Sequence, residues 1–235
     1  MGYYYGVPMD AKSFRIEAAK NCYPLRNKLC LIAFLYLLIT GGIGVVGSIT
    51  MFEKVFFING IEYKFSFDWF NSIASLIVSG PLLYGMISVD QSVYSRTYDV
   101  PVSDLFTGFK KFGQTLVIHL LVSIFTFLWT LLFIIPGIIK SISYSMAMYV
   151  YHDNPTLSPK QCIDKSKKIM DGHKWDYFCL MLSYIGWILL SALTLGILLL
   201  WVLPKIQQAT YIFYQYVSGN MREDKPYDFE ENLEF

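Results

Sequence analysis

The sequence predicts an all-α integral membrane protein with six transmembrane helices. Of its 235 residues, 54% are hydrophobic and only 16% are charged, a balance displaced from that of a soluble domain. Several apolar runs are long enough to cross a hydrocarbon core about 30 Å thick, and Lys and Arg collect in alternate connections. The net charge of +1 argues against a nucleic-acid partner, because phosphate binding needs a strongly basic face.

The apolar runs divide into six spans. Residues 113–155 are too long for one helix, and Ile135-Pro136-Gly137 is expected to form a tight turn within them, because Pro and Gly disfavour helix interiors. Residues 175–217 divide in the same way at Thr194-Leu195-Gly196. The expected spans are about 29–51, 69–94, 113–134, 137–153, 175–193 and 196–217, in a single membrane domain over 1–235 with an acidic cytoplasmic tail at 218–235.

Basic residues predict the orientation of these spans. The N-terminal segment, the connections after the second and fourth spans, and the tail hold nearly all of the Lys and Arg residues, whereas the opposite side holds only Lys54 and Lys64. Cytoplasmic loops carry the excess of positive charge. Both termini are therefore expected in the cytoplasm.

A unit of three parts recurs three times: a basic amphipathic segment, an apolar span, and a span with Pro followed by polar residues. In the third unit, Ser158 and Gln161 predict a capping box and Gly172 a helix end, with Cys162 and Met170 on the apolar face. The second unit has Ser103 as its expected cap; the first covers residues 11–23. We expect interfacial helices that anchor the chain at the membrane surface, the alternative being a site for a lipid headgroup or a partner.

The second span of each unit carries polar residues at helical spacing. These residues are expected to face a shared interior or an aqueous cavity, because polar groups in hydrocarbon cost free energy; the alternative is that they only bond helices together. The candidate interior residues are Gln91, Lys140, Tyr144, Lys205, Gln208, Tyr211 and Gln215, and the helix-break residues are Pro81, Pro136, Gly137 and Pro204.

Two lysines among these residues need a partner or water. A charged residue at the centre of a span costs about 2.5 to 3.5 kcal/mol. Lys140 lies close to the outer turn and is expected to extend to that surface, although a functional role stays open. Lys205, which follows Pro204, lies deeper and is the leading single functional candidate of the sequence.

No motif for catalysis, a cofactor or a metal stands out, so a non-enzymatic protein is expected. His152, Asp153 and His173 lack a fourth ligand and are interpreted as solvated loop residues rather than a metal site. His119, within the third span, is expected to be a hydrogen-bonded packing residue. The four cysteines form no CxxC pair and are interpreted as free thiols.

Motifs in the second half of the chain resemble a known bacterial family. They are Ile135-Pro136-Gly137-Ile138-Ile139-Lys140, Tyr144-Ser145-Met146, Asp153-Asn154-Pro155, Ser166-Lys167-Lys168-Ile169-Met170, Gly172-His173-Lys174-Trp175, Gly186-Trp187, Thr194-Leu195-Gly196, Pro204 and Phe213-Tyr214. The chain is similar in these residues to the integral membrane family named domain of unknown function 975, and its first half resembles the family by layout. The resemblance implies a multi-pass protein of the bacterial cytoplasmic membrane and supplies no activity, substrate or catalytic residue.

Two functions from different classes follow as hypotheses. In the first, spans two, four and six line a polar interior that transports or binds a small or lipidic ligand. In the second, the protein is an accessory or scaffold that assists a transporter, an envelope-stress response or a peptide-resistance system through a membrane protein partner or a homo-oligomer. The lipid bilayer is the partner that both hypotheses share, and a lipid-modifying enzyme is a third, less favoured alternative.

Overall fold

The computed structural model describes residues 9–49, 54–58, 61–65, 68–95, 100–194 and 196–221, and, within these ranges, side chains outside 41–73. Most of the predicted acidic tail lies outside the described residues. The elements are α1 (Ala11–Cys22), η1 (Tyr23–Leu25), α2 (Arg26–Ile49), β1 (Lys54–Ile58), β2 (Ile61–Phe65), α3 (Asp68–Tyr94), η2 (Val102–Lys111), α4 (Phe112–Leu132), α5 (Ile134–Tyr144), α6 (Ala147–Asp153), α7 (Pro159–Ile169), α8 (Lys174–Leu193) and α9 (Leu199–Ser218), where η marks a 3₁₀ helix.

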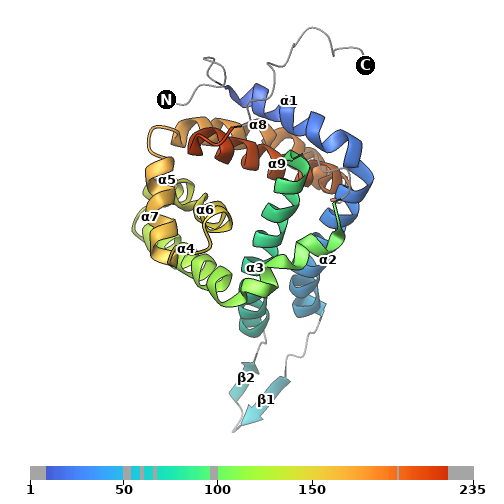
Figure 1. Ribbon diagram of the computed structural model, residues 1–235. Coiled ribbons are helices and arrows are strands. Elements are labelled where there is room, and N and C mark those ends of the chain that lie inside the picture. The colour runs from blue at the N-terminus through green and yellow to red at the C-terminus, as the bar shows by residue number, and fades with distance from the viewer. Residues whose placement is uncertain are drawn as a thin grey trace.

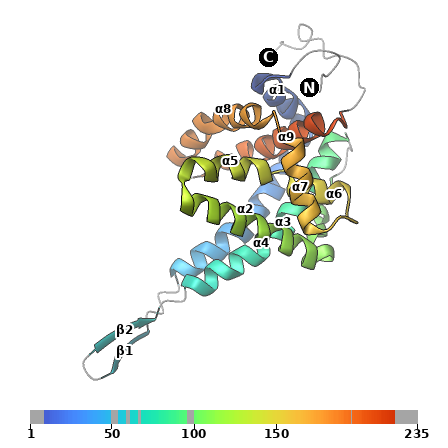
Figure 2. The ribbon, with the colours of Figure 1, turned by 90° about the vertical axis from the view of Figure 1, so that its left-hand side faces the viewer.

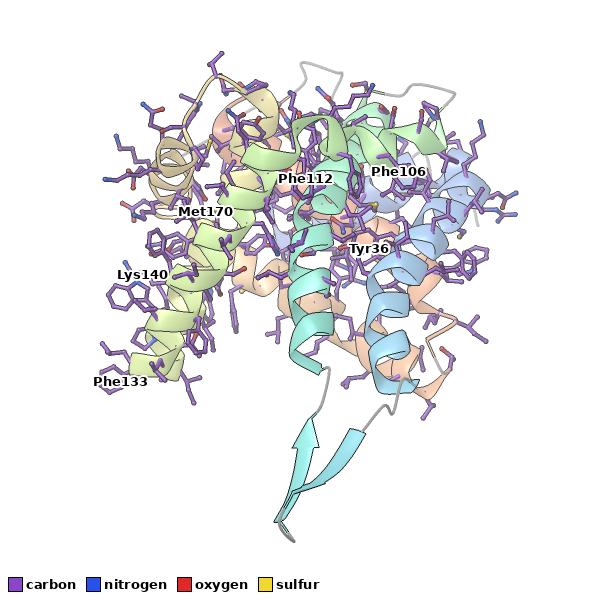
Figure 3. All side chains as sticks on the ribbon, turned by 90° about the horizontal axis from the view of Figure 1, so that it is seen from below. Tyr36, Phe106, Phe112, Phe133, Lys140 and Met170 are labelled. Atoms are coloured by element: carbon purple, nitrogen blue, oxygen red, sulfur yellow. The ribbon has the colours of Figure 1, made fainter. Side chains whose placement is uncertain are left out.

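The helices form three antiparallel hairpins, α2–α3, α4–α5 and α8–α9 (Figures 1 and 2). Helix α3 contacts members of all three hairpins as well as η2 and α6. Phe133, at the turn of α4–α5, lies toward the same end as β1 and β2, whereas Phe106 and Phe112 lie at the opposite end (Figure 3). The connections within the hairpins therefore lie toward one end of the molecule, and η2 lies at the other.

A β-hairpin joins α2 to α3 where the sequence analysis placed only a loop. Strands β1 and β2 pair antiparallel, with Lys54 opposite Phe65 and Ile58 opposite Ile61. The signal was present in the sequence, because β-branched and aromatic residues flank Asn59-Gly60, a dipeptide typical of two-residue hairpin turns.

The turn of the α4–α5 hairpin falls at Phe133 and not at Pro136-Gly137 as predicted. Phe133 adopts an extended conformation, with φ −156° and ψ 138°, directly between the two helices. Pro136 lies in the first turn of α5, where a missing backbone N–H costs no helical hydrogen bond. Gly137 serves the close packing of the hairpin, because a Cβ at this position would lie 2.7 Å from the Cα of Thr130.

The α8–α9 turn is confirmed at its predicted position. Gly196 has a φ of 85°, a left-handed conformation that glycine adopts without steric cost, and its N–H donates to the carbonyl of Ser191 at 2.8 Å. The capping box of α7 is also confirmed: the N–H of Ser158 donates to Oε1 of Gln161 at 2.8 Å, and the N–H of Gln161 donates to Oγ of Ser158 at 3.4 Å. Local sequence chemistry therefore predicted these helix ends correctly.

The apolar faces of α1 and α7 are buried inside the protein. Phe14, Ala18 and Cys22 of α1 pack against α8 and α9, and the Phe14 ring lies 5.4 Å from that of Phe213. On α7, the face that includes Cys162 and Met170 is buried in the same way, against α4, α5 and α6. These faces are covered by protein and are not available to anchor the chain in lipid.

Helix η2 lies directly on the backbone of α3. A Cβ on Gly85 of α3 would lie 1.8 Å from the carbonyl oxygen of Leu105, and one on Gly108 of η2 would lie 2.0 Å from that of Pro81. Glycine permits such close backbone approach because it has no side chain. The prediction that Ser103 caps this helix is wrong. Helix η2 begins directly after Pro101, and no side chain caps its first turn.

Among the described residues, four helical segments are long and apolar enough to cross a membrane: Ala11–Thr40, Ala74–Tyr94, Val102–Leu132 and Lys174–Leu193. They indicate a membrane protein. The fourth expected span is interrupted between α5 and α6 at Ser145 and Met146, and the sixth, α9, is less apolar because it carries Lys205, three glutamines and three tyrosines. More than half of the α3 segment is buried inside the protein, whereas α4 and α8 expose most of their apolar side chains.

The contact between η2 and α3 predicts the effect of adding one methyl group. Gly85→Ala and Gly108→Ala should each lower the free energy of unfolding by about 1 to 3 kcal/mol, because the new Cβ meets backbone that cannot move aside. Gly186→Ala on α8, where a Cβ meets nothing within 4 Å, is the matched control and should leave stability unchanged or slightly higher. Thermal unfolding of the purified protein in detergent measures the difference. Equal stability of all three variants would show that η2 does not lie against α3 in this way.

Candidate functional site

A carboxyl group is buried where α3 and α9 cross. Asp90 of α3 is 3% exposed and Gln208 of α9 is fully buried. In the amide orientation that satisfies its neighbours, the side-chain nitrogen of Gln208 donates to the backbone carbonyl of Asp90 at 3.1 Å and to its Oδ1 at 3.3 Å. The other carboxyl oxygen, Oδ2, has no hydrogen-bond partner in the described part of the chain. Such a group is costly to bury and therefore marks a candidate site.

A cluster of tyrosines from α3, α6 and α9 lies near this carboxyl group. The rings of Tyr94 and Tyr211 lie 5.5 Å apart, those of Tyr149 and Tyr211 lie 6.3 Å apart, and those of Tyr149 and Tyr214 lie 5.3 Å apart. Tyr149 and Tyr211 lie within electrostatic range of Asp90. No ion pair in the described residues joins Asp90 to Lys or Arg, and the groups within its electrostatic range include the phenols of Tyr149 and Tyr211 and the thiol of Cys22.

Four of the seven predicted interior residues are buried. Gln208, Tyr211 and Gln215 lie on α9, which places a polar stripe against α3 and α6. Tyr144 of α5 is buried elsewhere: its ring lies 6.2 Å from that of Phe125, and the ammonium group of Lys167 lies 5.5 Å from its centre. The structure therefore brings Gln208 into contact with Asp90 and Tyr211 into its electrostatic range, whereas Gln215 lies beside Tyr211 and Tyr144 lies apart from them.

The other three predicted interior residues lie elsewhere. Gln91 and Lys205 are exposed, although each is next in sequence to a buried residue, Asp90 or Pro204. Successive residues of a helix point about 100° apart, so the prediction that placed Gln91 and Lys205 inside was wrong. Lys140 is half-buried, with its ammonium group 4.9 Å from the centre of the Trp129 ring.

The predicted helix-break residues take different roles. Pro81 and Pro204 lie inside continuous helices. The backbone of Pro81 contacts Gly108, and the carbonyl of Pro204 accepts a weak hydrogen bond from Sγ of Cys22 at 3.8 Å. Pro136 and Gly137 belong to α5, as described above. These residues fix helix contacts, and none of them lies at an open break.

Sequence analysis missed Asp90 although a signal was available. Asp90 is the only charged residue between Trp69 and Tyr94, and an ionisable residue within an apolar span is a functional hypothesis by default. Two serines near Asp90 on α3 face η2: Ser88 Oγ lies 3.0 Å from Oγ1 of Thr107, and Ser92 donates to Oδ2 of Asp104 at 3.4 Å.

A second polar cluster joins α6 to α3 and α9. Nε2 of His152 lies 3.2 Å from Oγ of Ser88, Nδ1 of His152 lies 3.6 Å from Oδ1 of Asp153, and Tyr214 donates to Oδ2 of Asp153 at 2.8 Å. The His152 side chain is almost entirely buried. The prediction that His152 and Asp153 are solvated loop residues is wrong, because the short helix α6 is enclosed by its neighbours.

Other histidines lie apart from this cluster. His173 lies 3.3 Å from Oδ2 of Asp176 on α8. His119 of α4 lies 2.9 Å from Oγ of Ser79, which confirms its expected role as a hydrogen-bonded packing residue. No group of three or more His, Cys, Asp or Glu residues that could hold a metal ion occurs in the ranges that the structure describes.

The contact between Asp90 and Gln208 predicts a non-additive effect on stability. Gln208→Met should lower the free energy of unfolding by about 1 to 3 kcal/mol, because it leaves the buried carboxyl without its donor. Asp90→Val combined with Gln208→Met should cost less than the sum of the two single changes, with a coupling of about 0.5 to 3 kcal/mol. Gln91→Met makes the same change on the exposed face of α3, is the control, and should change stability by less than about 0.5 kcal/mol. Strictly additive effects in an unfolding series would exclude the contact.

One comparison with known proteins gives a match. Residues 131–221 match the family described as "Protein of unknown function (DUF975)". The matched range includes α5 to α9, and thus Tyr149, Gln208 and Tyr211, whereas Asp90 lies before it. No curated protein and no solved structure is significantly similar to the chain. Over residues 131–221 the chain is therefore similar to the DUF975 family, as the motifs of its second half indicated.

Proposed function

We propose that the protein is a non-enzymatic membrane transport protein whose polar interior, centred on Asp90 and Gln208, binds the cation that it moves. The observation that carries the proposal is a carboxyl group that is 3% exposed and has one oxygen, Oδ2, without a partner in the described residues. In transporters, buried carboxyl groups are typical of ion pathways and proton relays, because their cost is accepted only where they act.

A proton is the cation that this site fits best. Gln208 contacts Oδ1 and leaves Oδ2 free to bind one. Asp90 and Gln208 are packed among buried side chains, including Tyr149 and Tyr211. A proton is the smallest cation, so its binding to the carboxyl group requires the least rearrangement of these side chains. Tyr149 and Tyr211 lie within electrostatic range of the carboxyl group, and a phenol hydroxyl can serve either as donor or as acceptor.

The proposal includes six crossings of a bacterial cytoplasmic membrane, with both termini in the cytoplasm. Three features support it: the hairpin connections lie toward one end of the molecule, η2 and its lysines lie at the other, and α1, η2 and α7 each precede one hairpin in sequence. The interruption between α5 and α6 and the polar residues of α9 also suit helices that face protein more than lipid. The three units would then be repeats of one plan.

A proton-flux assay tests the proposal. The full-length protein is reconstituted in liposomes that contain a pH-sensitive dye, and a pH gradient is imposed. Wild-type protein should dissipate the gradient faster than protein-free vesicles, whereas Asp90→Asn should return the rate to that of protein-free vesicles because Asn binds no proton. Asp104→Asn is the control, since this carboxyl lies in η2 and accepts from Ser92.

Two results would contradict the proposal. Flux that is unchanged in Asp90→Asn would remove Asp90 from the pathway. The absence of flux above protein-free vesicles, together with a stoichiometric protein partner recovered in mild detergent, would favour the accessory or scaffold function.

A further inference from the structure

The 3₁₀ helix η2 presents an aromatic stripe on its outer face. A 3₁₀ helix has three residues per turn, so side chains three residues apart align. Phe106, Phe109 and Phe112 have this spacing, and successive ring centres lie 6.2 and 6.5 Å apart. All three are about 40% exposed. The opposite face of η2, with Leu105 and Gly108, is buried against α3, so the stripe is held on a rigid base.

Lys110 and Lys111 end this helix. Lys110 is exposed, and Lys111 donates to the hydroxyl of Tyr84 at 2.9 Å. Neither forms an ion pair with a carboxylate in the described residues. The acidic residue of η2, Asp104, lies in its first turn, where it accepts from Ser92. The stripe therefore carries uncompensated positive charge at one end.

The position of the stripe identifies what covers it. It is continuous with α4, whose apolar side chains, such as Val117 and Leu120, remain exposed beyond Phe112 and would face acyl chains. Phe106 and Phe112 lie at the end of the molecule away from Phe133, where a membrane–water interface is expected (Figure 3). Aromatic residues beside lysines suit this zone, because rings enter the acyl boundary while ammonium groups meet phosphates.

We infer that η2 and the first residue of α4 bind anionic phospholipid through Phe106, Phe109 and Phe112 in the acyl boundary, with the exposed Lys110 on the headgroup phosphate. This surface is separate from Asp90, and the inference stands whether or not the protein carries protons. The rings distinguish the ligand from a soluble anion, since inorganic phosphate has nothing to place against them. Lys111 lies on the inner face of η2, in line with Leu105 and Gly108, and its ammonium group lies 5.3 and 5.8 Å from the centres of the Tyr84 and Tyr151 rings, so the headgroup contact is assigned to Lys110 alone.

Lipid retention by the full-length protein in an uncharged detergent tests the inference. Native mass spectrometry compares bound phosphatidylglycerol with phosphatidylcholine of the same chain length. Wild-type protein should retain more phosphatidylglycerol, and Lys110→Gln should weaken this preference about fivefold, the contribution of one lysine near anionic lipid. Lys165→Gln, an exposed lysine of α7, removes the same charge away from η2 and should keep the wild-type preference.

Two further arms separate the lipid from other anions. Phe109→Ser should reduce phosphatidylglycerol retention although all lysines remain, and excess inorganic phosphate should not displace the lipid. An unchanged preference in Lys110→Gln would overturn the inference. An equal loss of the phosphatidylglycerol preference in Lys165→Gln would show that the preference depends only on net charge and would also overturn the inference. Displacement of the lipid by inorganic phosphate would show that the site binds soluble anions instead.

Discussion

The close packing of η2, α6 and α9 around α3 is the constraint on which the rest of this structure depends. Inside a bilayer, a polar group is tolerated only where protein pairs or encloses it. Gly85 and Gly108 bring η2 onto the α3 backbone, and the crossing of α3 with α9 places Gln208 beside Asp90. Without this enclosure the carboxyl of Asp90 would face lipid, at a cost of at least about 2.5 kcal/mol.

The helices also differ in how much of their surface the protein buries. Helices α4 and α8 expose broad apolar faces suited to acyl chains, while α6 and most of α9 are buried. Two polar clusters accordingly lie on α3, α6 and α9, one around Asp90 and Gln208, and one around His152, Asp153 and Ser88. Such a division suits a protein that works through its interior and meets the membrane through η2 and its outer helices.

Sequence periodicity predicted the helices well and their internal contacts poorly. Apolar length located the three helical hairpins but not the β1–β2 hairpin, and the predictions of the α7 cap residues and of Gly196 were correct because these residues act through local backbone chemistry. The α4–α5 turn was misplaced, since Gly137 is required by packing against Thr130 and not by the turn itself. Gln91 and Asp90 show the same limit: which of two adjacent polar residues faces inward depends on how α3 is rotated against α9 and η2, and that is set by long-range packing.

Infrared spectroscopy of the full-length protein in lipid nanodiscs, with isotope-labelled aspartate, tests the central claim most directly. The band of Asp90 is assigned by its loss in Asp90→Asn. Gln208→Met should shift this band, because the carboxyl oxygen loses its donor, and Gln91→Met should leave it in place. A band that stays at its wild-type frequency in Gln208→Met, or moves equally in Gln91→Met, would contradict an interior in which α9 holds the carboxyl group of α3.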